Sequence, residues 1–226
     1  MVNILIIGGA GYIGTALAER LIRESYNVTI FDSLYHRQDS IPRLEHMLNT
    51  GMLVNDALLR KFNADAPPKN FRFIQADIRD TSSLERVFSE DRFDYVFHFG
   101  ELVGVACCKE HPKDAENINV QATKSVVNLA ISHNVTLIWN STSSIYGYRE
   151  NPSLLDESAT LPPALSLDLY SQKKVACEND IVDNAQQHPD FQYIILRPAT
   201  VGGLSPRMRL ELLPNHFTYA IFRGRL

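Results

Sequence analysis

The sequence is poor in the features that mark exported, disulfide-bonded and membrane proteins. Its 226 residues include three cysteines, an odd number without the paired spacing of a zinc site or a disulfide framework (Cys107, Cys108 and Cys177). The amino-terminal MVNILIIGGAGYIG is a short apolar run, interrupted by glycines and without a basic flank, which argues against a signal peptide or a membrane span. We therefore expect a cytoplasmic protein with reduced thiols that serve in packing, and no membrane partner.

An excess of positive charge is also missing. The formal net charge is −4, and the scattered Lys and Arg form no basic stripe of the kind that neutralises a phosphate backbone. Nucleic acid is therefore not expected as a partner. We find no internal repeat and no low-complexity segment. With 45% hydrophobic and 21% charged residues, the chain is long enough to bury a substantial core in one large domain, with or without a small appendage.

Short β-branched or aromatic runs alternate with helical patterns along the chain. Several of these runs are apolar almost throughout, as in parallel strands that helices cover on both faces. The pattern predicts an α/β fold, a doubly wound parallel sheet of the Rossmann type. The link 39–70 is long, so we expect a helical insertion there. The expected strands cover residues 3–7, 27–31, 71–75, 93–99, 134–139 and 191–196.

The first expected strand runs directly into a glycine-rich turn, GGAGYIG at 8–14, which is followed by a helical stretch. Glycines at such a turn let the backbone approach a pyrophosphate, whose charge the free amides of the helix start stabilise. The second strand ends at Asp32, where a carboxylate can accept hydrogen bonds from ribose hydroxyls and would repel a 2'-phosphate. The order strand, glycines, helix, strand and acid predicts binding of NAD rather than NADP.

A tyrosine and a lysine stand four positions apart in LDLYSQKK, within a helical pattern. Residues at this spacing share one face of a helix, so Lys174 can favour the ionised form of Tyr170 and make it a usable acid or base. The pair alone is a weak motif, because solvated helix pairs with this spacing are common. Two other residues are expected to be structural: His98, which has no second metal ligand spaced with it, and Trp139, which we place in the core.

Taken together, the motifs resemble those of the extended short-chain dehydrogenase/reductase family, and most closely its nucleotide-sugar epimerases and dehydratases. The resemblance covers positions 1 to about 205. It rests on GGAGYIG, Asp32, Asp77-Ile78, His98-Phe99-Gly100, Asn117-Ile118-Asn119, STSSIYG at 141–147, Tyr170 with Lys174, and LRPATVGG at 196–203.

The resemblance implies a role for each matching residue. Tyr170 would be the acid/base, Thr142 the hydroxyl that bonds the same sugar oxygen, and Lys174 the cation on the nicotinamide ribose. Ser143, Thr200 and Asn215 would contact the nucleotide-diphosphate sugar. No metal is implied. The residues implied for NAD are Gly8, Gly11, Tyr12, Ile13 and Gly14 at the turn, Asp32 on the ribose, Asp77 and Ile78 on the adenine, and Phe99, Gly100, Asn119, Lys174 and Pro198.

The residues after Thr142 favour one reaction of the family. The dehydratases usually carry an Asp-Glu pair there, whereas this sequence has Ser143-Ser144, whose hydroxyls cannot readily serve as a general base near neutral pH. We therefore favour an epimerase that transfers a hydride transiently to tightly bound NAD. The alternatives are a 4,6-dehydratase or a reductase of nucleotide sugars, and a noncatalytic NAD-binding relative or fragment.

The carboxyl-terminal part departs from the family pattern. Members usually continue for about another hundred residues beyond LRPATVGG, in a smaller domain that holds the substrate. We expect an NAD-binding domain over 1–205 and the incomplete start of the substrate-binding region over 206–226. The resemblance also implies a homodimer that pairs through the helical stretches near 112–133 and 169–187.

Overall fold

The computed structural model describes residues 1–35, 69–148, 155–205 and 207–224. The chain forms two compact units, one of residues 1–100 with 200–226 and one of residues 101–199. The helical insertion expected at 39–70 lies almost entirely outside the described residues.

Four parallel strands form the sheet of the first unit, in the order β3-β2-β1-β4. Strand β1 lies in the centre of this sheet, and its Ile7 is paired in register with Phe31 of β2 on one side and with His98 of β4 on the other. Nearly all of β1 is buried, as expected for a strand covered on both faces. The strands are β1 (Asn3–Ile7), β2 (Asn27–Asp32), β3 (Phe71–Gln75) and β4 (Tyr95–His98).

The described residues of the first unit include three helices. Helix α1 follows the glycine turn and buries Ala18 in a cluster with the apolar side chains of β1 and β2. Helix α4 begins after Asp80, whose carboxylate accepts a hydrogen bond from the Ser83 amide at 3.3 Å. The helices are α1 (Tyr12–Arg23), α4 (Thr81–Glu90) and α9 (Leu213–Phe222).

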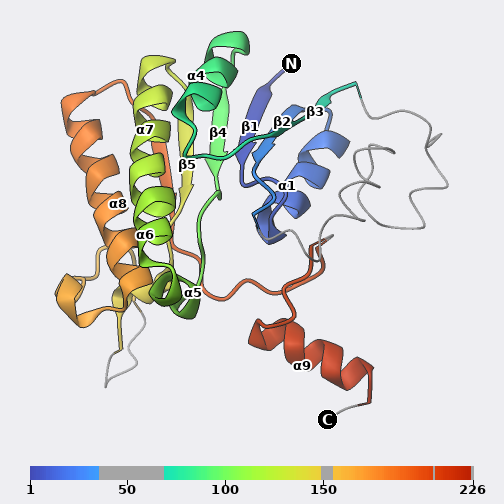
Figure 1. Cartoon of the computed structure of the whole chain (residues 1–226), viewed down its shortest axis with the longest axis vertical. Coiled ribbons are helices and arrows are strands. Elements are labelled where there is room, and N and C mark those ends of the chain that lie inside the picture. Colours follow the sequence, from blue (N-terminus) through green and yellow to red (C-terminus); the bar gives the residue numbers. More distant parts are fainter. Residues whose placement is uncertain (36–68, 149–154, 206, 225–226) are drawn as a thin grey trace. The chain divides into compact units, whose positions relative to one another are not determined.

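The second unit pairs two parallel strands with a group of helices. Strand β5 aligns Leu137 with Tyr193 of β6 and Asn140 with Leu196. Helices α7 and α8 lie side by side in Figure 1. The elements are α5 (Val105–Glu110), α6 (Pro112–Asp114), the π-helix η2 (Ala115–Gln121), α7 (Ala122–Ser132), β5 (Thr136–Asn140), the short 3-10 helices η3 (Ser143–Tyr146) and η4 (Ala164–Ser166), α8 (Leu169–Gln187) and β6 (Tyr193–Leu196).

The predicted α/β fold with parallel strands is confirmed, and each expected strand is present with ends that agree within two residues. One strand departs from the expected burial. In β6, Ile194 is 51% exposed and Leu196 is 41% exposed, so one face of this strand is open. An apolar run indicates a strand, but it does not say which helix covers each face. Among the described residues, no helix is both long enough and apolar enough to cross a membrane.

Candidate functional site

The glycine turn lies between β1 and α1, and at Gly8 and Gly14 a side chain would collide with backbone atoms. Gly8 has φ +77°, and a Cβ there would lie 2.4 Å from the amide nitrogen of Gly100. A Cβ on Gly14 would lie 2.5 Å from the carbonyl oxygen of Gly8. The Gly11 amide donates to that same carbonyl at 3.1 Å, which closes the turn. This backbone cradle at a helix start fits a pyrophosphate.

Asp32 ends β2 beside the same turn. Its carboxylate accepts hydrogen bonds from the amide of Ala10 at 2.9 Å and from the amide of Leu34 at 2.7 Å. Burial raises the pKa of Asp32, while these two amides and the charge of Arg207 oppose the rise. The carboxylate is thus fixed next to the glycine turn, at the position where a ribose would follow the pyrophosphate.

The other predicted cofactor residues of the first unit lie at the same carboxyl edge of the sheet. Phe99 follows β4, and its amide donates to the Ile7 carbonyl at 2.8 Å. Ile78 is buried after β3. Asp77 accepts from the Arg79 guanidinium at 2.7 Å, and this bond lowers the pKa of the Asp77 carboxyl. Strand ends at this edge are where open α/β sheets bind ligands.

The start of the carboxyl-terminal segment is joined to α1. The Tyr12 hydroxyl donates to the Gly203 carbonyl at 2.7 Å and accepts from the Asn215 amide at 3.0 Å. The Asn215 side chain also bonds the backbone of Gly203 and of Arg209. Its amide is therefore occupied within the protein, while Thr200 is exposed and Ile13 is half-buried. The substrate contacts of Thr200 and Asn215 and the cofactor contact of Ile13 stay predictions.

The predicted acid/base pair lies at the start of α8 in the second unit. Asp168 caps this helix and accepts from the Ser171 amide at 3.0 Å, so Tyr170 falls in the first turn. The Lys174 ammonium lies 5.7 Å from the centroid of the Tyr170 ring. The expected proximity of these two side chains on one helix face is confirmed.

The partner of Lys174 was not predicted from the sequence. The Lys174 ammonium contacts the carboxylate of Glu101 and the carbonyl oxygen of Asn140, and it lies 4.5 Å from the centroid of the Trp139 ring. The other Glu101 oxygen accepts from the Trp139 indole N–H at 3.0 Å. Trp139 is fully buried, as expected, but it also orients Glu101. The sequence offered one signal for Glu101. It is an acidic residue directly after Phe99-Gly100 at the end of the fourth strand, much as Asp32 stands at the end of the second.

Thr142 follows the carboxyl end of β5 and caps η3. Its hydroxyl accepts from the Ser144 amide and donates to the Ser144 hydroxyl, both at 3.2 Å. The Ser143 amide donates to the Pro198 carbonyl at 2.9 Å, which ties this loop to the segment after β6. Ser144 thus holds the Thr142 side chain, whereas the expected ligand contacts of Thr142, Ser143 and Pro198 stay predictions.

Asn119 fixes the loop that carries Glu101. It is 1% exposed within η2, and its amide both accepts from the Leu102 N–H at 2.7 Å and donates to the Leu102 carbonyl at 2.8 Å. The Cys177 thiol donates to the Asn119 carbonyl at 3.1 Å. Burial raises the pKa of Cys177 to about 12, in keeping with a packing role. A direct cofactor contact of Asn119 stays a prediction.

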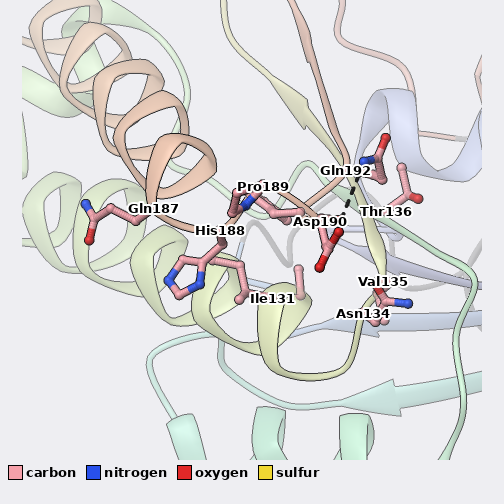
Figure 2. A pocket seen from close by; sticks show the side chains of 11 residues that line it. Ile131, Asn134, Val135, Thr136, Gln187, His188, Pro189, Asp190 and Gln192 are labelled. Atoms are coloured by element: carbon pink, nitrogen blue, oxygen red, sulfur yellow. Dashed lines mark hydrogen bonds between the residues drawn. The ribbon is translucent and has the colours of Figure 1, made fainter.

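The second unit has a pocket of about 380 Å³, whose lining side chains Figure 2 shows. It includes Thr136, which begins β5, whereas Thr142 follows the other end of that strand. None of the predicted site residues lines it, and ligands of open α/β sheets bind at the carboxyl ends of strands. We therefore do not assign the reaction to this pocket.

A metal centre was not expected from the sequence. Within the described ranges, no group of three or more His, Cys, Asp and Glu side chains could hold a metal ion. His98 is fully buried at the end of β4, in keeping with the structural role predicted for it.

Comparison with known proteins agrees with the fold and the motifs. The chain is 30% identical over 214 residues to UDP-arabinose 4-epimerase 1 of Arabidopsis thaliana, a match that covers 94% of this chain and 46% of that protein. The chain thus spans about half the length of the curated relatives it matches.

Two solved structures have a closely similar fold. The UDP-glucose 4-epimerase of Thermotoga maritima with UDP-glucose is 26% identical with a TM-score of 0.75, over 99% of this chain and 64% of that one. The UDP-N-acetylglucosamine 4-epimerase of Methanobrevibacter ruminantium M1 in complex with UDP-N-acetylmuramic acid is 25% identical, also with a TM-score of 0.75, over 99% of this chain and 63% of that one.

The family model matches residues 4–223, nearly the whole chain. This match confirms the predicted family and NAD as its cofactor. The chain belongs to the NAD dependent epimerase/dehydratase family.

Proposed function

We propose that this chain is the NAD-binding and proton-transferring part of a UDP-sugar 4-epimerase. The observation that carries the proposal is the arrangement at the start of α8, where Tyr170 and the buried Lys174 share one face beside the carboxyl end of β5. Relatives that match over most of this chain are UDP-sugar 4-epimerases, which supports UDP-sugars as the substrate class.

The cofactor role falls to the first unit. The turn of Gly8, Gly11 and Gly14 would hold the pyrophosphate, and the Asp32 carboxylate would accept the ribose hydroxyls. The Asp32 carboxylate would repel the 2'-phosphate of NADP, so we expect the chain to bind NAD rather than NADP. Bound NAD supplies a reversible acceptor for the hydride that leaves the sugar carbon.

Proton transfer falls to the second unit. The Tyr170 phenolate takes the proton of the sugar hydroxyl as the hydrogen on the same carbon leaves as a hydride, which yields a ketone. Return of the hydride to the opposite face, with return of the proton from Tyr170, gives the epimer, so atoms and electrons balance over the cycle. Thr142, whose hydroxyl Ser144 holds, would bond the same oxygen.

The test is interconversion of UDP-sugars by the chain with added NAD, followed by NMR. UDP-arabinose and UDP-glucose are tested first, because they are the sugars of the matched relatives. We expect the epimer to form, and Tyr170→Phe to slow this by about a hundredfold or more, the usual effect of losing a general acid/base. Tyr148→Phe is the matched control, since Tyr148 is 93% exposed. Cofactor binding without interconversion would indicate a noncatalytic relative.

We further infer a homodimer built on α7 and α8. These helices pack on one another in the second unit, and Val182 on α8 is 37% exposed. Light scattering should give twice the mass of the chain, and a monomer at high protein concentration would contradict this inference.

We place the protein in a reducing compartment, the cytoplasm. All three cysteines are free thiols, and burial raises the pKa of Cys108 to about 11. A buried thiol of this kind is slow to form a disulfide. Fractionation of cells with an antibody against the chain tests the location.

A further inference from the structure

Two neighbouring lysines of α8 form ion pairs of different character. Lys173 pairs with Glu116, and both side chains are partly open, with 25% and 38% exposed. Lys174 pairs with Glu101, and these side chains are only 1% and 2% exposed. Burial of two charges costs a large desolvation free energy, so such a pair requires close contacts and further hydrogen bonds. An ion pair at the surface contributes little to the stability of the fold.

The buried pair has those further hydrogen bonds. An ammonium group has three donors, and two of those of Lys174 meet the Glu101 carboxylate and the Asn140 carbonyl. Glu101 accepts in addition from the Trp139 indole at 3.0 Å. The backbone N–H and carbonyl of the next residue, Leu102, both form hydrogen bonds with the side-chain amide of Asn119. Glu101 therefore has a fixed position on the ammonium.

The position of Glu101 bears on the acid/base residue. The Lys174 ammonium lies 5.7 Å from the Tyr170 ring, a distance at which an unbalanced positive charge favours the phenolate. Burial raises the pKa of Glu101, and the contact with the Lys174 ammonium and the bond from Trp139 oppose the rise. Paired with that ammonium as a carboxylate, Glu101 carries the opposite charge and favours the neutral phenol. The electrostatic effect on Tyr170 is thus set by two side chains rather than by lysine alone.

We propose that Glu101 is a positioning residue that holds Lys174 and balances its charge, so that Lys174 by itself does not ionise Tyr170. This inference rests on the proposed function for the acid/base role of Tyr170. It implies that the phenol ionises only when further positive charge is brought to it by a ligand. Oxidised nicotinamide carries such a charge, which would make proton transfer conditional on the cofactor.

The other titratable groups around Tyr170 do not replace this pair. Burial raises the pKa of Cys108 to about 11, so this thiol is neutral at pH 7. Cys107 packs in the same cluster as Tyr170. Several charged or titratable groups of α8 and of the described elements that pack on it have partners of their own: Asp168 with Ser171, Glu116 with Lys173, Glu178 and Tyr146 with Arg197, and Lys124 with Asp180. The others are Cys177 of α8, whose pKa burial raises to about 12, Asp183 of α8, and Lys109 and Glu110 of α5.

The test is the titration of Tyr170 in the cofactor-free chain by NMR, with tyrosines labelled at the ring carbon that bears the hydroxyl. The resonance is assigned by its loss in Tyr170→Phe. We expect Glu101→Gln, which removes one negative charge at nearly constant shape, to lower the titration midpoint by about half a pH unit or more. The matched control is Glu116→Gln, which should leave it unchanged. A midpoint in Glu101→Gln that equals or exceeds the wild-type value would overturn the proposal.

Folding of the variants is checked on Trp139. It is the single tryptophan of the chain, so its indole N–H resonance reports on this site alone. If Glu101→Gln does not fold, the wild-type chain decides. With Lys174 balanced, cofactor-free Tyr170 should titrate near the ordinary tyrosine value of about 10. A midpoint about two units lower would contradict the proposal.

The titration separates this inference from the proposed function, because it uses neither cofactor nor sugar. The chain could interconvert a UDP-sugar while the Tyr170 titration midpoint stays the same in Glu101→Gln. This result would overturn the role of Glu101 and leave the epimerase proposal standing. The expected shift in a chain that converts no sugar would support the role of Glu101 and overturn the epimerase.

Discussion

The carboxylate of Asp32 accepts a hydrogen bond from the backbone amide of Ala10 at 2.9 Å, which fixes the acid at the end of β2 against the glycine turn. A second amide, from Leu34, holds its other oxygen at 2.7 Å. The turn and the acid, separated by about twenty residues in sequence, are thus held together at one edge of the sheet, where we propose that they bind the cofactor.

Asp32→Asn should weaken NAD binding by about tenfold to a hundredfold, because hydrogen bonds to a charged acceptor are stronger than those to an amide. Calorimetry on the cofactor alone measures this. Glu85→Gln, a change at an exposed position of α4, is the control. Equal affinity of Asp32→Asn and the wild type would contradict the assignment.

The same residue predicts a pH dependence. Burial raises the pKa of Asp32, and in the proposed site the ionised form would accept from both ribose hydroxyls. NAD should therefore bind with full affinity above the raised pKa, and the affinity should fall as the pH drops through that pKa. This loss should occur at a higher pH than it would if the group were an exposed aspartate. Binding measured over this range should lose the step in Asp32→Asn, and a step retained in the variant would assign it to another group.

The glycines of the turn should differ in their tolerance of alanine. A Cβ at Gly14 would lie 2.5 Å from the Gly8 carbonyl oxygen, whereas the nearest atom to a Cβ at Gly11 is 3.1 Å away. Gly14→Ala forces backbone shifts and should cost about 1–3 kcal/mol of unfolding free energy, with a smaller cost for Gly11→Ala. Urea unfolding measures both, and equal costs would contradict the packing described here.

Arg197 should be the most sensitive ion-pair partner of the second unit outside the site. Its guanidinium forms bonds of 2.6 and 3.0 Å to Glu178, whose side chain is 6% exposed, and donates to the Tyr146 hydroxyl at 3.1 Å. Arg197→Ala leaves that carboxylate buried without its cation, so we expect a loss of about 3–5 kcal/mol.

The control for Arg197 is Arg72→Ala, which breaks an exposed pair with Asp91 and should cost about 1 kcal/mol or less. Thermal and urea unfolding of the two variants compare them directly. A similarly small loss of unfolding free energy in both variants would show that the Arg197 pair contributes little to the stability of the fold.

The fold and the placement of the glycine turn beside Asp32 were predictable because they depend on local sequence order. The strand before Gly8 and the strand that ends at Asp32 place their residues at one sheet edge whatever the remaining contacts are. Tyr170 and Lys174 were predictable for the same reason, since four residues along a helix bring side chains to one face.

The contacts of Lys174 with other elements were not predictable. Glu101 stands 73 positions away in sequence, and no periodicity connects the two. The bonds of the Asn119 and Asn215 side chains to the protein backbone were not predicted either. Side-chain partners of this kind depend on tertiary packing, which hydrophobic patterns do not describe.

The proposed reaction is a transient hydride transfer at the sugar carbon with Tyr170 as acid/base. The most direct measurement uses a UDP-sugar deuterated at C4, incubated with the chain and NAD, with the product analysed by NMR and mass spectrometry. We expect the C4 epimer with the deuterium retained, and far less of it with Tyr170→Phe. An epimer that carries hydrogen from water at C4, or no epimer at all, would contradict it.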